Sequence, residues 1–328
     1  MRIVVPAGGI GGARFLRGLK AALGVDAPAP GEQSTDAITV IGNTGDDITL
    51  FGLRICPDLD TVMYTLGGGI DEERGWGRAE ETFTIKEELA AYGMRPTWFG
   101  LGDRDTATHI VRAQMIAAGY PLSAITEALC DRWRPGVRLL PMTDDQVETH
   151  VVIEEDGKRR AIHFQEWWIR YRASVPALSI VGVGAEDAAP APGVLKAIAE
   201  ADLVVLPPSN PVVSVGSILN VPGIRDAMVD KTVVGVSPII GGAPVRGMAD
   251  ACLTAIGVET SAGAVAAHLG ADLLDGWLVD EADAGTEVEG IEVRSRPLYM
   301  SDPAATEAIA GAALDLGREL AGRKGGRG

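Results

Sequence analysis

Two short acidic segments have the composition of a metal or phosphate site. Residues 43–47 read Asn-Thr-Gly-Asp-Asp directly after an apolar run, and residues 57–61 read Pro-Asp-Leu-Asp-Thr. Mg²⁺ prefers oxygen ligands and keeps water for substrate phosphates, so one or two carboxylates suffice for it. Structural interpretations compete with this one: an Asx turn for Asp46 and Asp47, and a helix N-cap for Asp60.

A glycine-rich loop near the N-terminus is the second candidate. Residues 8–12 read Gly-Gly-Ile-Gly-Gly, between an apolar run at 3–5 and a stretch with helical spacing at 13–23. The N–H groups of such a loop and the following helix N-terminus can hold a phosphate. The loop lacks a Walker lysine, and it misses the dinucleotide spacing because Arg14 stands at the last glycine position. Phosphate contact is favoured over a tight turn without a ligand.

Other polar residues give weaker indications. Residues 102–109 place alternating charges at a predicted helix start, where Asp103 and Arg104 either contact a ligand or form a solvated first turn. His163 is more typical of a structural histidine than of a base, and Trp167 and Trp168 are more typical of a core. The four histidines lack zinc-hydrolase spacing and no G-x-S-x-G motif occurs, which disfavours covalent catalysis.

The elements that would position these residues read as alternating strands and helices. Continuous apolar runs predict strands buried on both faces of a parallel sheet, and helical spacing predicts the crossovers. Ligands bind outside the carboxyl ends of such strands, so we expect the four loops that follow them at one edge. The predicted strands are 3–5, 37–41, 201–206 and 232–236; the loops are 8–12, 42–47, 207–216 and 237–245; the helices are 193–200, 247–256, 262–269 and 303–321.

The predicted fold class is α/β: a doubly wound, Rossmann-like, mostly parallel sheet built from residues 1–60 and 135–328. A mainly helical insertion, residues 61–134, is expected to cap it. Period-two runs on either side of Asp156-Gly157 predict a hairpin. Residues 24–36 predict a surface connection, and residues 322–328 predict a frayed basic tail.

Charge and composition exclude several classes of protein. The 328 residues include 29 Lys and Arg against 45 Asp and Glu, a net charge of −16, so no basic surface for nucleic acid is expected. No apolar run reaches the roughly 18 residues of a membrane span. The three cysteines are far apart, which predicts neither disulfides nor a zinc knuckle, and the first residues lack signal-peptide anatomy. We expect a cytoplasmic protein.

Several motifs together resemble a known family. In order along the chain, residues 8–14, 43–47, 57–61, 101–109, 163–165, 208–211 and 237–241 resemble the 2-phospho-L-lactate transferase family, including its actinobacterial phosphoenolpyruvate transferase branch. These enzymes act in the biosynthesis of the deazaflavin coenzyme F-420. The resemblance covers about residues 1–300. Residues 11–14 read Gly-Gly-Ala-Arg, which departs from the Gly-Thr-Pro-Lys type of the archaeal members and fits the actinobacterial branch.

The resemblance implies a reaction, a cofactor and a partner. The ribityl hydroxyl of the deazaflavin Fo would attack the outer phosphorus of a guanylated phosphoenolpyruvate or phospholactate, releasing GMP, with Mg²⁺ as cofactor and a homodimer as the assembly. Asp46 and Asp60 would act at the metal and the reacting hydroxyl, and Asp103 and Arg104 would contact the deazaflavin. The residues assigned to the guanosine diphosphate portion are Gly9, Gly11, Gly12, Asn43, Ser209, Asn210, Ser237 and Gly241.

Two alternatives from other functional classes stay open at this stage. A nucleotide-sugar-binding regulator of the gluconeogenesis-factor type also opens with a strand, a glycine loop and an Asp-Asp turn, but would bind without turnover. A nicotinamide-dependent oxidoreductase rests only on the first strand-loop-helix. Enolpyruvyl, lactyl and glyceryl donors differ by a few atoms, and the resemblance favours the enolpyruvyl group.

Overall fold

The computed structural model describes residues 1–25 and 37–325, and its centre is a seven-stranded sheet. The strand order is β14-β13-β10-β9-β1-β2-β5, and every neighbouring pair is parallel. The predicted α/β class with a parallel sheet is confirmed. The strands are β1 (Ile3–Ala7), β2 (Ile38–Gly42), β5 (Arg138–Pro141), β9 (Leu203–Leu206), β10 (Val233–Val236), β13 (Gly276–Val279) and β14 (Glu292–Ser295).

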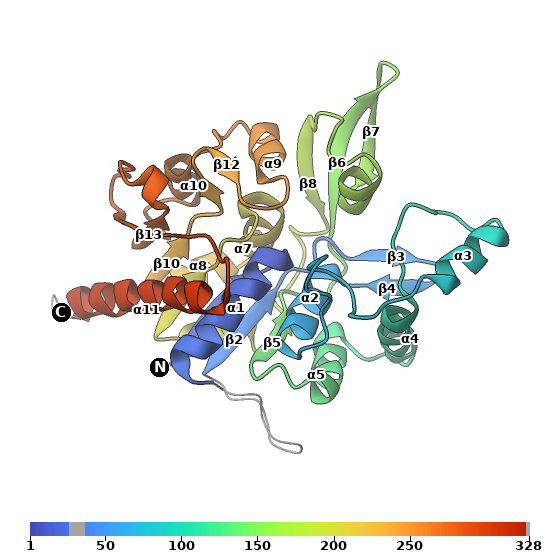
Figure 1. Ribbon diagram of the computed structural model, residues 1–328, viewed down its shortest axis with the longest axis horizontal. Helices are drawn as coiled ribbons and strands as arrows, with labels where there is room; N and C mark the ends of the chain where they lie inside the picture. The colour runs from blue at the N-terminus through green and yellow to red at the C-terminus, as the bar shows by residue number, and fades with distance from the viewer. Residues whose placement is uncertain (26–36, 326–328) are drawn as a thin grey trace.

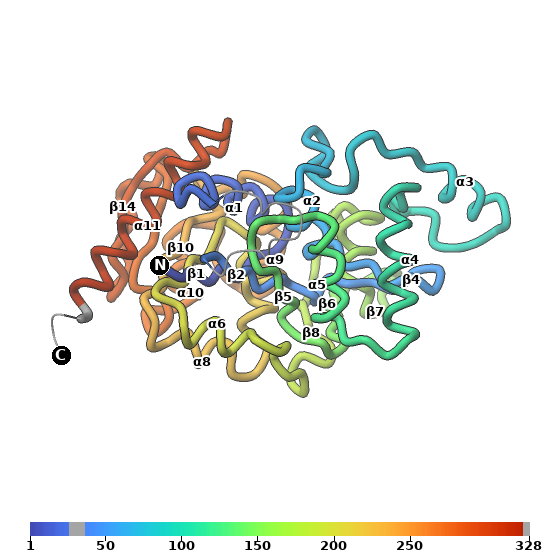
Figure 2. Tube along the Cα trace, turned by 90° about the horizontal axis from the view of Figure 1, so that it is seen from below, coloured from blue at the N-terminus to red at the C-terminus, as the bar shows by residue number. Residues whose placement is uncertain are grey.

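Helices cover both faces of this sheet because its central strands are apolar on both sides (Figure 2). Val5 of β1 packs into one core and Val4 into the other, as alternation along a strand requires. One face is covered by α1 (Gly9–Leu23), α2 (Pro57–Leu66), α5 (Leu122–Trp133) and α11 (Pro303–Gly325). The other is covered by α6 (Val194–Glu200), α8 (Ile224–Val229), α9 (Ala249–Ala255) and α10 (Ala262–Leu269).

Two polar segments were predicted from the sequence to lie outside the sheet and its helices, residues 24–36 and residues 322–328. The predicted surface connection at 24–36 lies almost entirely outside the described residues, since only its first two residues are placed. The predicted frayed tail is wrong over its first residues, because α11 continues to Gly325. Arg323 bonds to Glu319 one helical turn back and to Glu292 of β14, and these ion pairs support the last turns. Residues 326–328 lie outside the described part.

A separate antiparallel sheet confirms the predicted hairpin. It has the order β7-β6-β8, with β6 (Glu148–Glu155), β7 (Lys158–His163) and β8 (Ser179–Val183). Asp156 and Gly157 both have positive φ, 53° and 72°, as a two-residue type I′ turn needs. A π-helical turn, η1 (Glu166–Arg170), follows β7 and brings Trp167 into the core of this sheet.

The insertion and the hairpin before it project to one side of the sheet (Figure 1). The hairpin is β3 (Ile48–Leu50) and β4 (Leu53–Ile55), and its apolar side chains pack with Leu101 into a small core of their own. Two helices of the insertion are α3 (Thr84–Ala91) and α4 (Asp103–Ala117), whereas α5 packs in the main core. The division at residues 61–134 stays a prediction.

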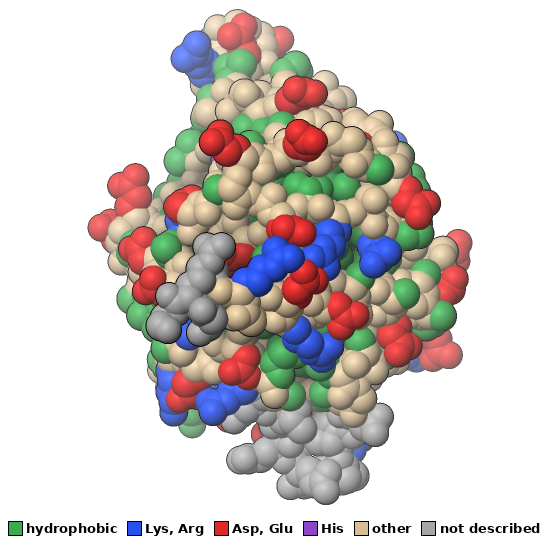
Figure 3. Space-filling model, turned by 90° about the vertical axis from the view of Figure 1, so that its left-hand side faces the viewer, with side chains coloured by type: hydrophobic (Ala, Val, Ile, Leu, Met, Phe, Trp, Pro, Cys, Tyr) green, Lys and Arg blue, Asp and Glu red, His purple; other side chains and the backbone are tan. Residues whose placement is uncertain are grey.

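Several short helical turns and strands lie between the larger elements. The short elements are η2 (Pro211–Gly216), α7 (Ser217–Leu219), β11 (Ile239–Ile240), β12 (Ala243–Pro244) and η3 (Glu281–Asp283). On the face seen in Figure 3, acidic and basic side chains are interspersed and form no continuous basic surface. Among the described helices, none combines the length and the apolarity needed to cross a bilayer.

Candidate functional site

A cavity of about 760 Å³ lies at the carboxyl ends of the central strands β10, β9, β1 and β2. Each of these strands is followed by one of the four loops predicted to meet at this edge, and all four loops line the cavity. The opposite wall comes from α2 and the insertion. Seven residues proposed from the sequence line the cavity: Gly9, Gly11, Asp46, Asp60, Ser209, Asn210 and Ser237.

The glycines after β1 allow the protein backbone itself to approach closely. A Cβ at Gly11 would lie 2.5 Å from the carbonyl oxygen of Pro208, and one at Gly12 would lie 2.5 Å from Ser209 Oγ. Ser209 Oγ also donates to the Gly8 carbonyl at 2.8 Å. The loop glycines are therefore required by packing, while α1 begins at Gly9 and presents its N-terminus to the cavity.

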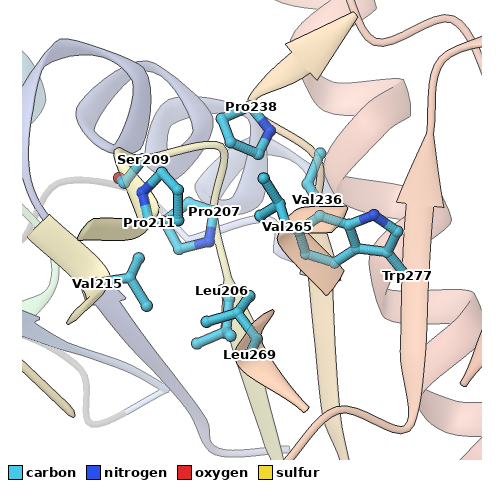
Figure 4. A pocket seen from close by; sticks show the side chains of 10 residues that line it. All are labelled: Leu206, Pro207, Ser209, Pro211, Val215, Val236, Pro238, Val265, Leu269 and Trp277. Carbon is cyan, nitrogen blue, oxygen red and sulfur yellow. The ribbon is translucent and has the colours of Figure 1, made fainter. Parts of the chain in front are cut away.

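The loops after β9 and β10 rest on an apolar base, seen in Figure 4. Pro207 and Pro211 lie beside Pro238, and Trp277 closes the space from the neighbouring strand. The enclosed space is only about 10 Å³, room for about one water molecule. It cannot take a substrate, so its contribution is to hold the two loops in fixed positions.

One group of buried polar side chains joins the loop after β2 to the start of α2. Asn43 donates from Nδ2 to Asp58 Oδ2 at 2.9 Å, and its Oδ1 accepts from the Gly45 N–H at 2.9 Å. The Asx turn expected for the two aspartates is thus made by Asn43. Burial raises the pKa of Asp58 to about 6, although the hydrogen bonds from Asn43 and the Gly9 backbone act to lower it. Burial and the charge of Asp58 raise the pKa of Asp46 well above its usual value.

A second group centres on Asp60, in the first turn of α2. This helix begins at Pro57 after Cys56, so the N-cap interpretation of Asp60 is wrong. The guanidinium of the fully buried Arg112 donates to Asp60 Oδ1, and His109 Nδ1 lies 3.8 Å from Asp60 Oδ2. Burial raises the pKa of Asp60, while Arg112 and His109 oppose the rise.

The same group continues through Asp105 to Tyr64. His109 Nε2 lies 3.5 Å from Asp105 Oδ2, and the Tyr64 hydroxyl donates to Asp105 Oδ1 at 2.6 Å. Burial disfavours ionisation of Asp105, yet His109 and Tyr64 together hold its pKa below the usual value. The result is a buried chain of polar groups along one wall of the cavity.

The donor set can hold a cation. One ligand atom each from Asp60, Asp105 and His109 lies within 4.8 Å of the other two. Within residues 1–25 and 37–325, Asp46 Oδ1, Asp60 Oδ2 and His109 Nε2 are buried without a hydrogen-bond partner. Unpaired buried carboxylate oxygens are costly, so Asp46 Oδ1 and Asp60 Oδ2 fit a cation or a substrate proton. Asp60 has its nearest titratable partners in α4, whereas Asp46 is grouped with Asp58.

Five of the residues proposed from the sequence do not line the cavity. Asn43 and Gly12 lie beneath it, and their contacts position Asp58 and Ser209. Asp103 accepts from the Thr82 hydroxyl and from the backbone at the start of α3, and the Arg104 guanidinium pairs with Glu80 at 3.2 Å. Gly241, with φ of +58°, donates its N–H to Asp283. His163 has the structural role expected for it, bonding the Asp47 carbonyl and the Gln165 N–H.

Sequence reasoning missed several residues of this cavity. Asp105 and His109 line the cavity and share a face of α4 with the buried Arg112, and their spacing of three and four residues was the available signal. Trp168 lines the cavity, although it was expected in the core with Trp167. The other missed lining residues include Arg14, Asp58, Tyr64, Arg74, Trp76 and Arg246.

Comparisons with known proteins match this chain along most of its length. The family model described as 2-phospho-L-lactate transferase CofD matches residues 3–304. A phosphoenolpyruvate transferase of Thermobifida fusca is 78% identical over 98% of this chain and 99% of its own. Proteins of the same name from Streptomyces coelicolor and Mycolicibacterium smegmatis are 68% and 59% identical, over 98% and 96% of this chain and 99% and 98% of theirs.

Solved structures show the same fold at lower identity. Protein BH3568 from Bacillus halodurans has a TM-score of 0.60 and 18% identity, covering 95% of this chain and 99% of that one. A second structure of it, described as a member of the UPF0052 family, has a TM-score of 0.58 and 19% identity, with the same coverage. At this identity the likeness concerns the fold alone. On the family match and the identity of the named relatives, the chain belongs to the 2-phospho-L-lactate transferase family of enzymes.

Proposed function

We propose that this chain transfers a phosphoenolpyruvyl or phospholactyl group from its guanosine diphosphate ester to the terminal ribityl hydroxyl of the deazaflavin Fo, and releases GMP. Family membership supports a transferase of this type in coenzyme F-420 biosynthesis. Because relatives 59% to 78% identical are named phosphoenolpyruvate transferase, the enolpyruvyl donor is the preferred one. The observation that carries the proposal is the cavity in which two groups of buried carboxylates face the N-terminus of α1.

The reaction is a displacement at phosphorus. The Fo hydroxyl oxygen forms a new bond to the outer phosphorus, the bond from that phosphorus to the bridging oxygen breaks, and GMP leaves with the electron pair. The hydroxyl proton passes to a carboxylate. Asp46 suits this role because its pKa is raised, and a base whose pKa is closer to the working pH transfers protons more effectively. Such a transfer needs positioning and charge neutralisation more than a covalent nucleophile.

Mg²⁺ is the proposed cofactor, and the residues present fit it. Asp46 and Asp60 remain the proposed ligands, and Asp105 and His109 place further ligand atoms close to Asp60. When bound, the ion supplies charge neutralisation to the diphosphate. Arg112 keeps Asp60 oriented, since its guanidinium is fixed by burial.

The remaining proposed roles concern binding. The N-terminus of α1 and the loops containing Ser209, Asn210 and Ser237 would hold the guanosine diphosphate portion, with Asn43 and Gly12 shaping the loops from beneath. Aromatic side chains from α2, the insertion and the segment after β7 suit the deazaflavin ring, with Asp103 and Arg104 at the start of α4. These aromatic residues are Tyr64, Trp76, Phe99, Phe164 and Trp168.

A product assay by mass spectrometry tests the proposal. Purified protein is offered Fo, Mg²⁺ and, in separate reactions, the enolpyruvyl, lactyl and glyceryl guanosine diphosphate esters. The expected result is GMP together with the matching deazaflavin product, fastest with the enolpyruvyl ester. Tight nucleotide binding with no product from any donor would contradict the proposal and favour the nucleotide-sugar-binding regulator.

A homodimer is part of the proposal. Several large apolar side chains are exposed on the insertion, Ile110, Val111, Ile116 and Tyr120, and are available to contact a second copy. Light scattering should then give twice the chain mass of 34.2 kDa. A single-chain mass at micromolar concentration would contradict the dimer and leave the transferase proposal intact.

A further inference from the structure

Two arginines that the proposed roles do not use lie at one end of the cavity. Arg14 is in the second turn of α1, Arg246 follows β12, and both line the cavity. A Cβ placed on Gly75 would come within 2.6 Å of Arg246 Nη1 and 3.1 Å of Ile10. The Arg246 guanidinium therefore reaches across to Gly75 and Ile10. Because Ile10 and Arg14 are four residues apart on one helix, they share the face of α1 that meets this guanidinium.

Two carboxylates of the neighbouring 67–83 segment are already engaged by other arginines. Glu72 pairs with Arg17 at 2.6 Å, and Asp71 pairs with Arg74 at 2.9 Å. In the part of the chain that the structure describes, neither Arg14 nor Arg246 makes a hydrogen bond or an ion pair. Burial and the charge of Arg246 lower the pKa of Arg14, and the attraction of Glu72 offsets only part of this fall. Two guanidinium groups that repel each other in a substrate cavity are relieved by an anion bound between them.

The position of the pair separates it from the glycine turn. Gly11 and Gly12 face Pro208 and Ser209, where the diphosphate is proposed to bind. Ile10, one helical turn before Arg14, lies instead beside Gly75 of the 67–83 segment, and the charge of Glu72 in that segment acts on Arg14. An anion held by the two arginines would therefore lie beyond the diphosphate, at the end of the donor that carries the acid.

We propose that Arg14 and Arg246 bind the carboxylate of the transferred three-carbon acid, an assignment that rests on the proposed function. The planar guanidinium fork matches a carboxylate and can donate to both of its oxygens. Such a subsite would reject guanosine diphosphate esters of neutral alcohols, because an unpaired cationic site would remain in the cavity.

The test compares two ligands on the same variants, Arg14→Gln, Arg246→Gln and the double substitution. The full guanylated donor has both a diphosphate and a carboxylate, whereas GDP has the diphosphate alone. We expect the KM for the donor to rise about tenfold or more in each single variant. The dissociation constant for GDP should stay within about twofold of that of the unmodified chain. Arg246→Lys keeps the charge but loses the planar guanidinium. Its KM for the donor should therefore lie between the values for the unmodified chain and for Arg246→Gln.

Arg318→Gln is the matched control, since it removes the same charge from an exposed position on α11. Thermal melting establishes that each variant folds, and the exposed Arg246 carries the test alone if Arg14→Gln does not fold. An unchanged donor KM in the Arg246→Gln variant and in the double variant would overturn the subsite while leaving the transferase proposal standing. An equal loss of GDP affinity would overturn the carboxylate assignment in favour of the diphosphate. Absence of transfer by the unmodified chain would overturn the proposed function, and the subsite with it.

Discussion

The two carboxylate groups of the cavity differ in what stabilises their charge. Asp60 has the guanidinium of Arg112 and the ring of His109 beside it. The described residues stabilise Asp46 and Asp58 with neutral donors instead, from Asn43, Thr149 and the Gly9 backbone. Both groups are buried, so the cost of removing charge from water is similar for each.

This difference assigns different roles to groups of the same chemical type. A carboxylate paired with a buried arginine stays ionised and is held in one orientation, which suits a fixed ligand or anchor. Two neighbouring carboxyl groups with no cation beside them share a proton, and both ionise only when a positive charge binds near them. We therefore expect the ionisation of the Asp46–Asp58 group to respond more strongly to substrate or cation binding than that of Asp60, whose raised pKa is opposed by Arg112.

The largest effect is expected from Asp46→Asn. The substitution keeps the shape of the side chain but removes the proton acceptor, so turnover should fall by about 10²- to 10⁴-fold. Initial rates of GMP release at saturating donor and Fo measure this. The exposed Asp187→Asn variant serves as control and should keep full turnover. Turnover of Asp46→Asn within a factor of two would remove Asp46 from the reaction.

The second expected effect is on stability and separates the two groups directly. Asp60→Asn leaves Arg112 as an uncompensated buried charge and should lower the free energy of unfolding by about 3–5 kcal/mol. Asp46→Asn removes a repulsive charge, so the free energy of unfolding should not fall. Urea unfolding at neutral pH measures both. The double variant Asp60→Asn/Arg112→Met should regain much of the loss, and equal losses for the two single variants would contradict the distinction.

The third expected effect is a pH dependence of stability from Asp58. Its pKa is about 6 in the folded chain against a usual 3.8, so between these values the folded state binds more protons than the unfolded state. The contribution of Asp58 to the free energy of unfolding therefore falls as pH rises through this window, by at most about 1.4 kcal/mol per pH unit. Asp58→Asn should gain stability relative to the unmodified chain as pH rises from about 4 to 6. A constant difference over that range would show that Asp58 titrates normally.

The smallest effect is expected at the outer end of the Asp60 group. Tyr64→Phe removes the hydroxyl that donates to Asp105 at 2.6 Å and should cost about 0.5–1.5 kcal/mol of unfolding free energy. The matched control is Tyr92→Phe, because this side chain is 83% exposed. Equal stability of the two variants would mean that the Tyr64 bond contributes nothing beyond solvation.

How far the sequence predicts this site differs between its parts. The Asn43–Asp47 turn and the glycine turn follow apolar strands directly, so their place at one edge of a parallel sheet could be predicted. The pairing of Asp46 with Asp60 is less well predicted, since the structure groups Asp46 with Asp58 and Asp60 with α4. Asp103 and Arg104 stand two and one residues before the lining residue Asp105, but they face α3 and Glu80.

The sequence by itself determined the α/β class, the four central strands with the loops that follow them, the hairpin at Asp156-Gly157 and the membership of a transferase family. Each of these depends on local periodicity, turn chemistry or motif identity, which are properties of consecutive residues. Only the tertiary structure decided that Arg112 neutralises Asp60 and that Arg14 and Arg246 line the same cavity. Those pairs join residues 52 and 232 positions apart, the differences of their residue numbers, and their placement depends on how whole helices and loops pack.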